Sequence, residues 1–322
     1  MKIQKGVSLG QYSTFRIGGR AEYFTEVKTK DELIEAVTWA RQKQLTIHLL
    51  GNGSNTLIAD SGVSGLAIRN LTGEIKTLDL TKSSTRSKIP PRFQFINNLT
   101  YDETKYPAVL VQLDSGVYIP KAIFSLISQG VTGLEWFSGI PATVGGATYI
   151  NLHGADKYWS DYLVCAEIID PQSQVKTVPL EYFRYDYDQS TLKTSGDLVL
   201  SVTLELRRGP AEQALAIAKL WQIKKSHQPQ RSLGCIFQNL SAAEQKRLNL
   251  PTASIGYLID KKLGLKGTKI GQAWLSEKHA GFVENLGQAT ASDVLELIKL
   301  VQIRAKAKLG LDLKLEIVIW PN

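Results

Sequence analysis

Two glycine-rich segments far apart in the chain carry residue types that can bind a phosphate group. Residues 51–55 read Gly-Asn-Gly-Ser-Asn and directly follow the apolar run 47–50, and residues 139–147 read Gly-Ile-Pro-Ala-Thr-Val-Gly-Gly-Ala. Glycine lacks a Cβ atom, so it adopts positive φ and lets the backbone approach a ligand, while Ser and Asn side chains add hydrogen bonds to phosphate oxygens. A single segment of this kind is more often a tight turn. The two together predict a site for the diphosphate of a dinucleotide.

Neither segment matches the two common phosphate-binding patterns. The chain has no G-x-x-x-x-G-K-[ST], and it has no G-x-G-x-x-G that opens a helix and is followed by an acidic residue on the next strand. The sequence therefore disfavours both a P-loop and a Rossmann fold.

Length and composition describe an ordinary soluble protein of two or three domains. The chain has 322 residues, of which 43% are hydrophobic and 21% are charged. Its two cysteines, Cys165 and Cys235, exclude a disulfide framework. No apolar run approaches the roughly 18 residues that span a bilayer, and residues 1–6 lack the hydrophobic core of a signal peptide. We therefore predict a cytoplasmic protein with no membrane partner.

The formal net charge of +8 raises the question of a nucleic-acid partner. Lysine and arginine are spread along the chain, and no basic run is interleaved with aromatic residues as single-strand binding requires. A solvated basic surface that attracts small anions is the better interpretation, and we expect no nucleic-acid partner.

The first glycine segment is expected to follow a helix and a strand. Thr29 and Glu32 form a capping-box pattern, and apolar residues then recur at helical spacing to about Gln44. Residues 46–50 read as the strand that leads into the segment. The start of the chain is therefore predicted to be mixed helix and strand.

The middle of the chain, from about residue 62 to 206, is rich in strand patterns. We expect strands at 65–68, 108–113, 164–169 and 198–206, with one helix at about 120–129. Residues 82–105 are polar and rich in turn residues, so they are interpreted as an inserted surface excursion.

The last third begins with a predicted helix at 211–226 and ends with a helix and a strand. The helix at 289–309 has Thr290 and Asp293 at its start and stops at Gly310. Residues 313–320 read as the final strand. No internal repeat is present.

An ordered series of short motifs runs along nearly the whole chain. It comprises residues 13–19, 51–55, 133–135, 139–147, 228–229, 234–239, 264–267, 276–280 and 315–317. The series resembles the UDP-N-acetylenolpyruvoylglucosamine reductases (UDP-N-acetylmuramate dehydrogenases), flavoenzymes that make a precursor of bacterial peptidoglycan. The spacing between Tyr187 and Gly234 is compatible with the short form of the family, which lacks an extra loop in the substrate domain.

The resemblance implies an α+β fold in which two FAD-binding subdomains of the PCMH type precede a C-terminal α+β substrate domain. Residues 1–72, joined by the terminal strand 312–322, would form the first subdomain, residues 73–209 the second, and residues 210–311 the substrate domain. It implies FAD as cofactor, NADPH as reductant, UDP-N-acetylglucosamine enolpyruvate as substrate, no metal, and a monomer.

The resemblance also implies a two-step reaction. NADPH reduces the flavin and leaves, hydride then passes to the far vinyl carbon of the enolpyruvyl ether, and an acid protonates the carbon that bears the ether oxygen. Cys235 matches the position of that acid, and Glu316 matches a carboxyl group that helps stabilise the enol form. Cys165 lies in no such motif and is interpreted as a core residue.

Further roles come from the family motifs residue by residue. Asp188 falls at a catalytic position, and substrate contacts fall to Tyr187, Ser190, Gln238 and Asn239. Cofactor contacts fall to Gly51, Asn52, Gly53, Ser54, Asn55, Ser115, Gly139, Ile140, Pro141, Thr143, Gly145, Gly146, Ala147 and Ile317.

The chain departs from the family pattern at three places. Asp188 replaces an arginine that stabilises charge on the substrate carboxylate, and loss of one such group commonly slows catalysis about a hundredfold or more. Arg184, four residues earlier, is a candidate substitute. Gln238 replaces a lysine expected near the substrate diphosphate. His153 introduces an imidazole near the flavin region, where it is a candidate contact to flavin or phosphate.

These departures leave two alternatives to the peptidoglycan reductase. An FAD oxidoreductase of the same superfamily acting on another substrate is favoured by Asp188 and Gln238, since both alter the charge that an anionic substrate meets. A catalytically degenerate, flavin-binding paralogue is the other.

Overall fold

The computed structural model describes residues 1–78 and 101–321, which form two compact units. The first unit contains residues 1–2, 25–51 and 68–226, and the second contains residues 3–24, 52–67 and 227–322. The boundaries of the units fall after residues 2, 24, 51, 67 and 226, and two of them therefore lie within β2 (Arg20–Val27) and β5 (Val63–Asn70), strands of a sheet of order β1-β2-β5-β3. The three-domain division predicted from the sequence stays a prediction.

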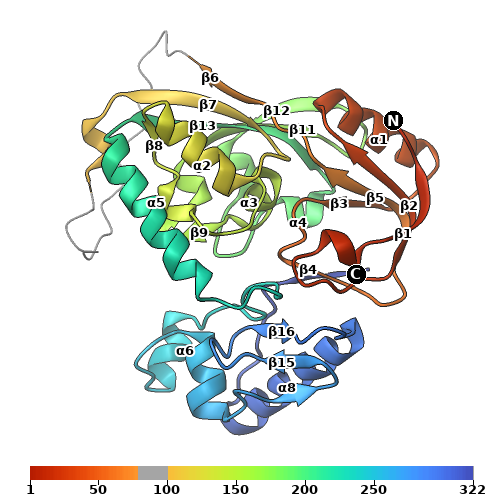
Figure 1. Cartoon of the computed structure of the whole chain (residues 1–322), viewed down its shortest axis with the longest axis vertical. Helices are drawn as coiled ribbons and strands as arrows, with labels where there is room; N and C mark the ends of the chain where they lie inside the picture. The colour runs from red at the N-terminus through yellow and green to blue at the C-terminus, as the bar shows by residue number, and fades with distance from the viewer. Residues whose placement is uncertain (79–100, 322) are drawn as a thin grey trace. The chain divides into compact units, whose positions relative to one another are not determined.

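The first unit is built on a six-stranded sheet with the order β12-β11-β13-β7-β6, to which β8 adds by pairing with β13. The pairs along this sheet are antiparallel. Helices α2, α3 and α5 lie on one side of it (Figure 1). The bounds are α1 Lys30–Gln42, β3 Ile47–Leu50, β6 Ile75–Leu78, β7 Ala108–Asp114, α2 Ile119–Ser128, β8 Val131–Thr132, α3 Val144–Ile150, β9 His153–Gly154, β10 Lys157–Tyr158, β11 Leu163–Ile169, β12 Val175–Pro179, α4 Leu192–Ser195, β13 Leu198–Arg208 and α5 Ala211–Ser226.

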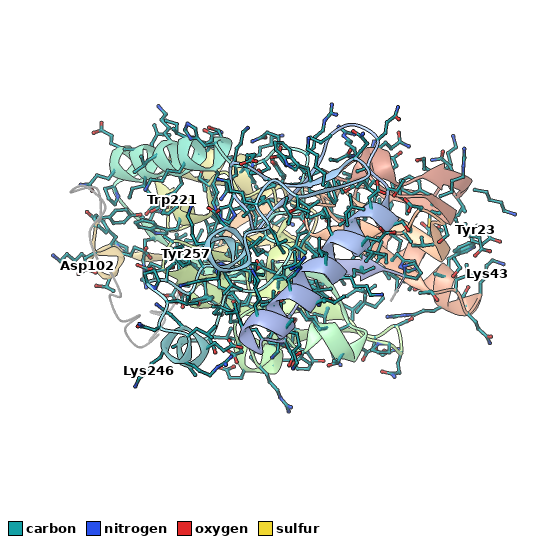
Figure 2. All side chains as sticks on the ribbon, turned by 90° about the horizontal axis from the view of Figure 1, so that it is seen from below. Tyr23, Lys43, Asp102, Trp221, Lys246 and Tyr257 are labelled. Carbon is teal, nitrogen blue, oxygen red and sulfur yellow. The ribbon has the colours of Figure 1, made fainter. Side chains whose placement is uncertain are left out.

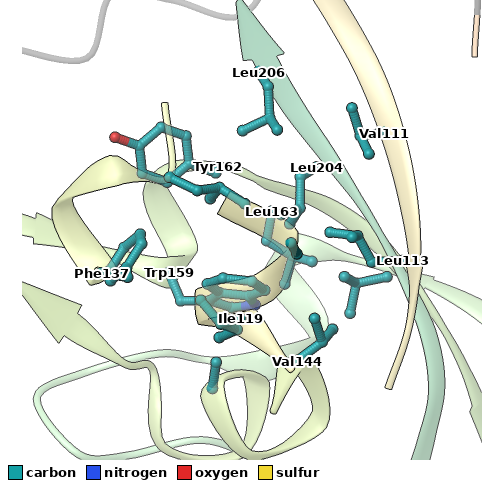
Figure 3. Close-up of a cluster of buried hydrophobic side chains, with 14 of the residues drawn as sticks. Val111, Leu113, Ile119, Phe137, Val144, Trp159, Tyr162, Leu163, Leu204 and Leu206 are labelled. Carbon is teal, nitrogen blue, oxygen red and sulfur yellow. The ribbon is translucent and has the colours of Figure 1, made fainter. Parts of the chain in front are cut away.

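The core of this unit holds the start of α3 in place. Val144, the first residue of that helix, packs among buried side chains of β7, β13 and the segment 137–163, which include Leu113, Trp159 and Leu204 (Figure 3). Trp159 Nε1 donates to Thr148 Oγ1 at 3.0 Å, which ties the helix to the same core. Burial of such apolar side chains contributes roughly 1.5–3 kcal/mol each, so the helix start is firmly positioned.

Two buried glutamates, Glu103 and Glu135, connect the end of the predicted insertion to this core. Glu135 is fully buried and accepts from Tyr101 Oη and from Gly133 N. Glu103 accepts from Trp136 Nε1 at 3.0 Å and pairs with Lys157 at 3.3 Å. The prediction that residues 82–105 form a surface excursion is therefore wrong at the end of that range, because Glu103 lies in the interior. Residues 82–100 lie outside the described residues.

Glu135 is expected to make the stability of the protein depend on pH. Burial raises the pKa of Glu135 to about 7, from 4.5 in an exposed chain. Between these values the folded state binds more protons than the unfolded state, so the free energy of unfolding falls by about 3 kcal/mol as pH rises from below 4.5 to above 7. Glu135→Gln should flatten this dependence, measured by denaturant unfolding across pH, whereas Glu212→Gln on the exposed face of α5 should not. Parallel profiles for wild type and Glu135→Gln would contradict this account.

The second unit combines short strands with three helices and one turn of π-helix. Strand β1 pairs antiparallel with β2, β17 pairs parallel with β4, and β14, β15 and β16 form a three-stranded sheet. Its buried core brings Phe15, Leu57 and Ile317 together with α8 and the segment 233–265. The bounds are β1 Gln4–Ser8, β4 Thr56–Ile58, α6 Ala242–Arg247, α7 Ile255–Tyr257, the π-helix Leu258–Leu263, β14 Lys269–Ile270, β15 Ala273–Leu275, β16 Val283–Asn285, α8 Ala291–Leu309 and β17 Val318–Trp320.

Local capping signals explain where α8 begins and ends. Thr290 and Asp293 form a capping box, which confirms the predicted start to within two residues, and Gly310 ends the helix in the left-handed conformation at φ 64°. Asp60 adds a cap from far away in the sequence, since its carboxylate accepts from Ala291 N at 2.8 Å and from Ser292 N at 3.0 Å.

The final strand is shorter than predicted. Only Val318–Trp320 form β17, whereas residues 316–317 are bent and Leu315 makes a single bridge with Phe237. The alternating apolar pattern of 313–317 arises because Leu313 and Ile317 are buried in the core of the second unit. Residue 316 therefore lies in a bend and not in a regular strand.

Basic side chains are distributed over the surface as the sequence suggested, including the exposed Lys43 and Lys246 (Figure 2). Within 1–78 and 101–321, no helix has the length and apolarity that crossing a membrane requires.

Candidate functional site

The second glycine segment leads directly into α3. Thr143 is the N-cap residue, and its hydroxyl accepts from Gly146 N at 3.3 Å. Val144 N donates to the Val117 carbonyl at 2.9 Å, and Gly145 N donates to the Ser115 carbonyl at 2.7 Å. These amides are therefore engaged inside the first unit, and they hold the segment against the end of β7.

Ser115 supports this turn from beneath. Its side chain is 1% exposed and its hydroxyl accepts from Asn70 Nδ2 at 2.8 Å. A Cβ atom at Gly145 would lie 3.1 Å from the Ser115 carbonyl oxygen, so glycine allows the close approach. Ser115 is therefore buried beneath the second glycine segment and supports it, and its predicted contact with the cofactor stays a prediction.

The first residue of the first glycine segment contacts the second segment. A Cβ atom at Gly51 would lie 2.4 Å from Thr143 Oγ1, so these two residues touch within the first unit. Gly139 adopts φ 81°, and a Cβ there would lie 2.8 Å from Lys225 Cβ on α5. The structure thus places Gly51, the first residue of one segment, against Thr143 of the other, although the sequence separates the two by almost ninety residues.

The rest of the first segment is held within the second unit. Gly53 has φ 59°, and a Cβ there would lie 2.5 Å from the Tyr12 carbonyl oxygen. Its own carbonyl accepts from Thr14 N at 3.2 Å and from Ser13 Oγ at 3.1 Å. The motif at 13–19 therefore acts as the support of this turn, which explains why it accompanies the glycine segment.

Asn55 joins this turn to the C-terminal segment. Its side-chain Nδ2 donates to the Glu316 carbonyl at 3.2 Å, and its carbonyl accepts from Val318 N at 2.9 Å. Glu316 N in turn donates to the Ile236 carbonyl at 2.9 Å. The first turn, the residue next to Cys235, and Glu316 therefore lie on adjacent backbone segments of one unit.

Cys235 is half-buried and packs at the edge of the core of the second unit. It makes a bridge with Phe282, and its neighbour Ile236 donates to the Gly281 carbonyl at 2.9 Å. Neither cysteine of the chain forms a disulfide. Cys165, expected in the core, is only half-buried on β11, whereas Leu163 and Ile168 of the same strand are fully buried.

The segment 186–190 forms a tight loop anchored to the end of α3. Asp186 and Gln189 exchange backbone hydrogen bonds, and Ser190 Oγ donates to the Tyr149 carbonyl at 2.5 Å. Asp188 takes the left-handed conformation at φ 49°, which an aspartate tolerates better than most residues. The predicted residues Tyr187, Asp188 and Ser190 therefore share one rigid turn.

A lysine that sequence reasoning missed pairs with Asp188. Lys193 Nζ lies 3.0 Å from Asp188 Oδ1 and donates to the Asp188 carbonyl at 2.6 Å. The predicted substitute, Arg184, is exposed at the end of a short helical turn, so the cation that accompanies Asp188 is Lys193. Lys193 lies five residues after Asp188, and this short spacing was the feature of the sequence that could have identified it.

Comparison with known proteins gives the family. The profile of the UDP-N-acetylenolpyruvoylglucosamine reductase C-terminal domain matches residues 226–320. Reductases of this name from Synechococcus sp. and Moorella thermoacetica are 31% and 32% identical, each over 99% of this chain and 94% of their own length. The chain belongs to the UDP-N-acetylenolpyruvoylglucosamine reductase family. The crystal structure of the reductase from Thermus caldophilus, 31% identical, matches all of both chains with a TM-score of 0.74.

Membership of the reductase family confirms the predicted α+β, FAD-binding fold class and the prediction of a flavin-dependent oxidoreductase with FAD as cofactor and NADPH as reductant. The two glycine segments fit this cofactor by their chemistry. Residues 51–55 and 139–147 contain no carboxylate, and they carry Asn, Ser and Thr side chains on backbone held without room for larger side chains at its glycines. Which of these residues contact FAD stays a prediction.

His153, a departure from the reductase pattern, lies beside the 186–190 loop. Its ring centroid is 5.3 Å from that of Tyr187 and 6.1 Å from that of Tyr158. Burial lowers the pKa of His153, Lys225 lowers it further, and Asp188 opposes them. A neutral imidazole packed on Tyr187 is therefore the expected state at neutral pH.

Gln238 and Asn239 lie on the segment that follows Cys235. Gln238 N donates to the Lys314 carbonyl at 3.0 Å, so a lysine stands on the neighbouring segment although position 238 has lost one. Asn239 is exposed, and its Oδ1 accepts from Ile255 N at 3.1 Å, which caps the turn that begins α7. The predicted site residues thus form two groups, one in each unit.

Proposed function

We propose that this protein reduces UDP-N-acetylglucosamine enolpyruvate to UDP-N-acetylmuramate for peptidoglycan synthesis, with NADPH as reductant. The observation that carries the proposal is the junction of Asn55, Glu316 and Ile236, because it joins a proposed cofactor turn to the backbone segments that contain Glu316 and Cys235. Relatives that bear the name of this reductase along 99% of the chain support the same conclusion.

The chain itself has to supply one proton and a charged environment. The hydride for the far vinyl carbon of the substrate would come from bound FAD, with NADPH as the reductant. The Cys235 thiol donates a proton to the carbon that bears the ether oxygen. One hydride and one proton are thus added across the double bond. The Glu316 carboxyl group stabilises the enol form in which negative charge develops.

Cofactor binding is proposed for the two glycine segments and the residues that accompany them. Gly51, Asn52, Gly53, Ser54 and Asn55 form the first group. The second group comprises Ser115, Gly139, Ile140, Pro141, Thr143, Gly145, Gly146 and Ala147, and Ile317 completes the set. Supporting this assignment, Asn52, Ser54 and Asn55 keep part of their surface exposed, as donors to a diphosphate must.

Substrate binding is proposed for Tyr187, Ser190, Gln238 and Asn239. The pairing of Asp188 with Lys193 removes one of the two reasons for preferring another substrate, since the aspartate does not meet an anionic substrate without a cation beside it. A monomer, a cytoplasmic location and the absence of nucleic-acid and membrane partners stay predictions that follow from the sequence.

The proposal is tested by identifying the product. Purified protein is incubated with NADPH and UDP-N-acetylglucosamine enolpyruvate, and the nucleotide sugar is analysed by mass spectrometry. We expect a product heavier by two hydrogen atoms, formed in proportion to the NADPH consumed. Unchanged substrate, with NADPH consumed at the rate seen without it, would contradict the proposal.

A further inference from the structure

Asp188 and Lys193 form an ion pair of unequal burial in the first unit. The Asp188 side chain is 6% exposed, while that of Lys193 is 23% exposed. An ammonium group has three N–H donors, and its contacts to the carboxylate and to the carbonyl of Asp188 account for two of them. The lysine side chain therefore keeps more of its surface exposed than the aspartate side chain that it pairs with.

Lys193 also lies against the end of α3. Its Nζ is 5.9 Å from the centroid of the Tyr149 ring, and Ser190 Oγ fixes the loop to the Tyr149 carbonyl. The start of the same helix carries Thr143 and the second glycine segment. Seven residues of α-helix span about 10 Å, so the point at which the 186–190 loop is fixed to the helix lies about one short helix from a proposed cofactor turn.

The proposed reaction requires positive charge at the substrate carboxylate. The enolpyruvyl group is an anion, and hydride addition to its far carbon moves further negative charge toward that carboxylate. Asp188 alone would repel it, and a buried carboxylate left without a cation is strongly unfavourable. A lysine on Asp188 addresses both requirements, because it neutralises the aspartate and has one N–H donor beyond the two that contact Asp188.

We propose that Lys193 is the catalytic cation that binds the substrate carboxylate and stabilises the charge built up on it, and that Asp188 is a positioning residue which holds its ammonium group. This inference rests on the proposed function and names a residue of that same site. It assigns Asp188 an indirect role in place of a direct contact with substrate.

The test compares Lys193→Met with a matched control, Lys176→Met. Lys176 resembles Lys193, since it pairs with Asp170 at 3.2 Å and lies 5.9 Å from a tyrosine ring, that of Tyr182. Anaerobic stopped-flow absorbance separates flavin reduction by NADPH from reoxidation by the enolpyruvyl substrate. We expect Lys193→Met to slow reoxidation about 100-fold, with flavin reduction within about threefold of wild type, and Lys176→Met to leave both unchanged.

A double variant distinguishes a catalytic role of Lys193 from a role in holding the 186–190 loop. If the pair only holds the loop, Asp188→Asn/Lys193→Met removes both buried charges and should recover most of the lost reoxidation rate. If Lys193 is catalytic, reoxidation in the double variant should remain as slow as in Lys193→Met. Reoxidation in Lys193→Arg should be at least tenfold faster than in Lys193→Met. Thermal unfolding of every variant reports the structural effect independently.

Several results would overturn the inference. These are recovery in the double variant, equal slowing of both half-reactions in Lys193→Met, or reoxidation within threefold of wild type. Failure of the proposed function looks different, because wild-type protein itself would then be reduced by NADPH and not reoxidised by this substrate. The wild-type trace thus separates the two failures.

Discussion

Replacing Cys235 with alanine is expected to slow reduction of the enolpyruvyl substrate by about 1,000-fold while leaving flavin reduction by NADPH nearly unchanged. The methyl group of alanine cannot donate a proton, and only the second half-reaction requires one. The site should otherwise persist, because Cys235 is half-buried and its segment is held by the backbone bonds of Ile236 to Gly281 and of Glu316 to Ile236. Anaerobic stopped-flow absorbance measures both half-reactions in one sample.

Two further variants make the Cys235 prediction specific. Cys235→Ser retains an O–H donor and should recover a large part of the lost rate. Cys165→Ala, which removes the other half-buried thiol of the chain, should leave both half-reactions unchanged. Equal slowing of both half-reactions in Cys235→Ala would exclude the thiol as the proton donor.

Replacing Gly53 with valine is expected to raise the dissociation constant for FAD by about 10- to 100-fold. Gly53 has φ 59°, and a Cβ would lie 2.5 Å from the Tyr12 carbonyl and 2.9 Å from Ser13 Cα. A β-branched residue there is strained and collides with backbone, so the turn must move away from the position from which Asn55 reaches Glu316. The FAD content of purified protein and a titration of apoprotein with FAD measure the effect.

Gly310 provides the matched control for Gly53. It lies in the same unit with a similar φ of 64°, but a Cβ there would meet nothing within 4 Å. Gly310→Val should therefore cost stability through backbone strain alone and leave FAD binding intact. Gly53→Ala covers the case in which the valine variant does not fold. Folded Gly53→Val with wild-type FAD affinity would show that this turn does not hold the cofactor.

Local signals in the sequence predicted the elements that the chain forms by itself. Helix α5 matches its predicted range of 211–226, and α8 begins at its capping residues and ends at Gly310 because hydrogen bonds within the first and last turns decide those boundaries. The final strand was overestimated at 313–320, since its extent depends on pairing with β4, which lies far away in the chain.

The sequence predicted which residues belong to the candidate site, but it did not predict the contacts between them. The motifs pointed to residues 51–55, Cys235 and Glu316, but the bond from Asn55 to Glu316 joins residues 261 positions apart and follows from no local pattern. The ion pair of Asp188 and Lys193 was missed for a related reason: the left-handed backbone at 188 turns the chain so that two residues five apart meet. Burial of Glu103 likewise depends on Trp136 and Lys157, which the sequence does not place beside it.

We expect this chain to pass electrons from NADPH to UDP-N-acetylglucosamine enolpyruvate through FAD. The most direct measurement is an anaerobic absorbance spectrum of the purified protein, recorded after one equivalent of NADPH and again after one equivalent of the substrate. We predict that the flavin band bleaches with the first addition and returns with the second. A band that bleaches and does not return would contradict this expectation.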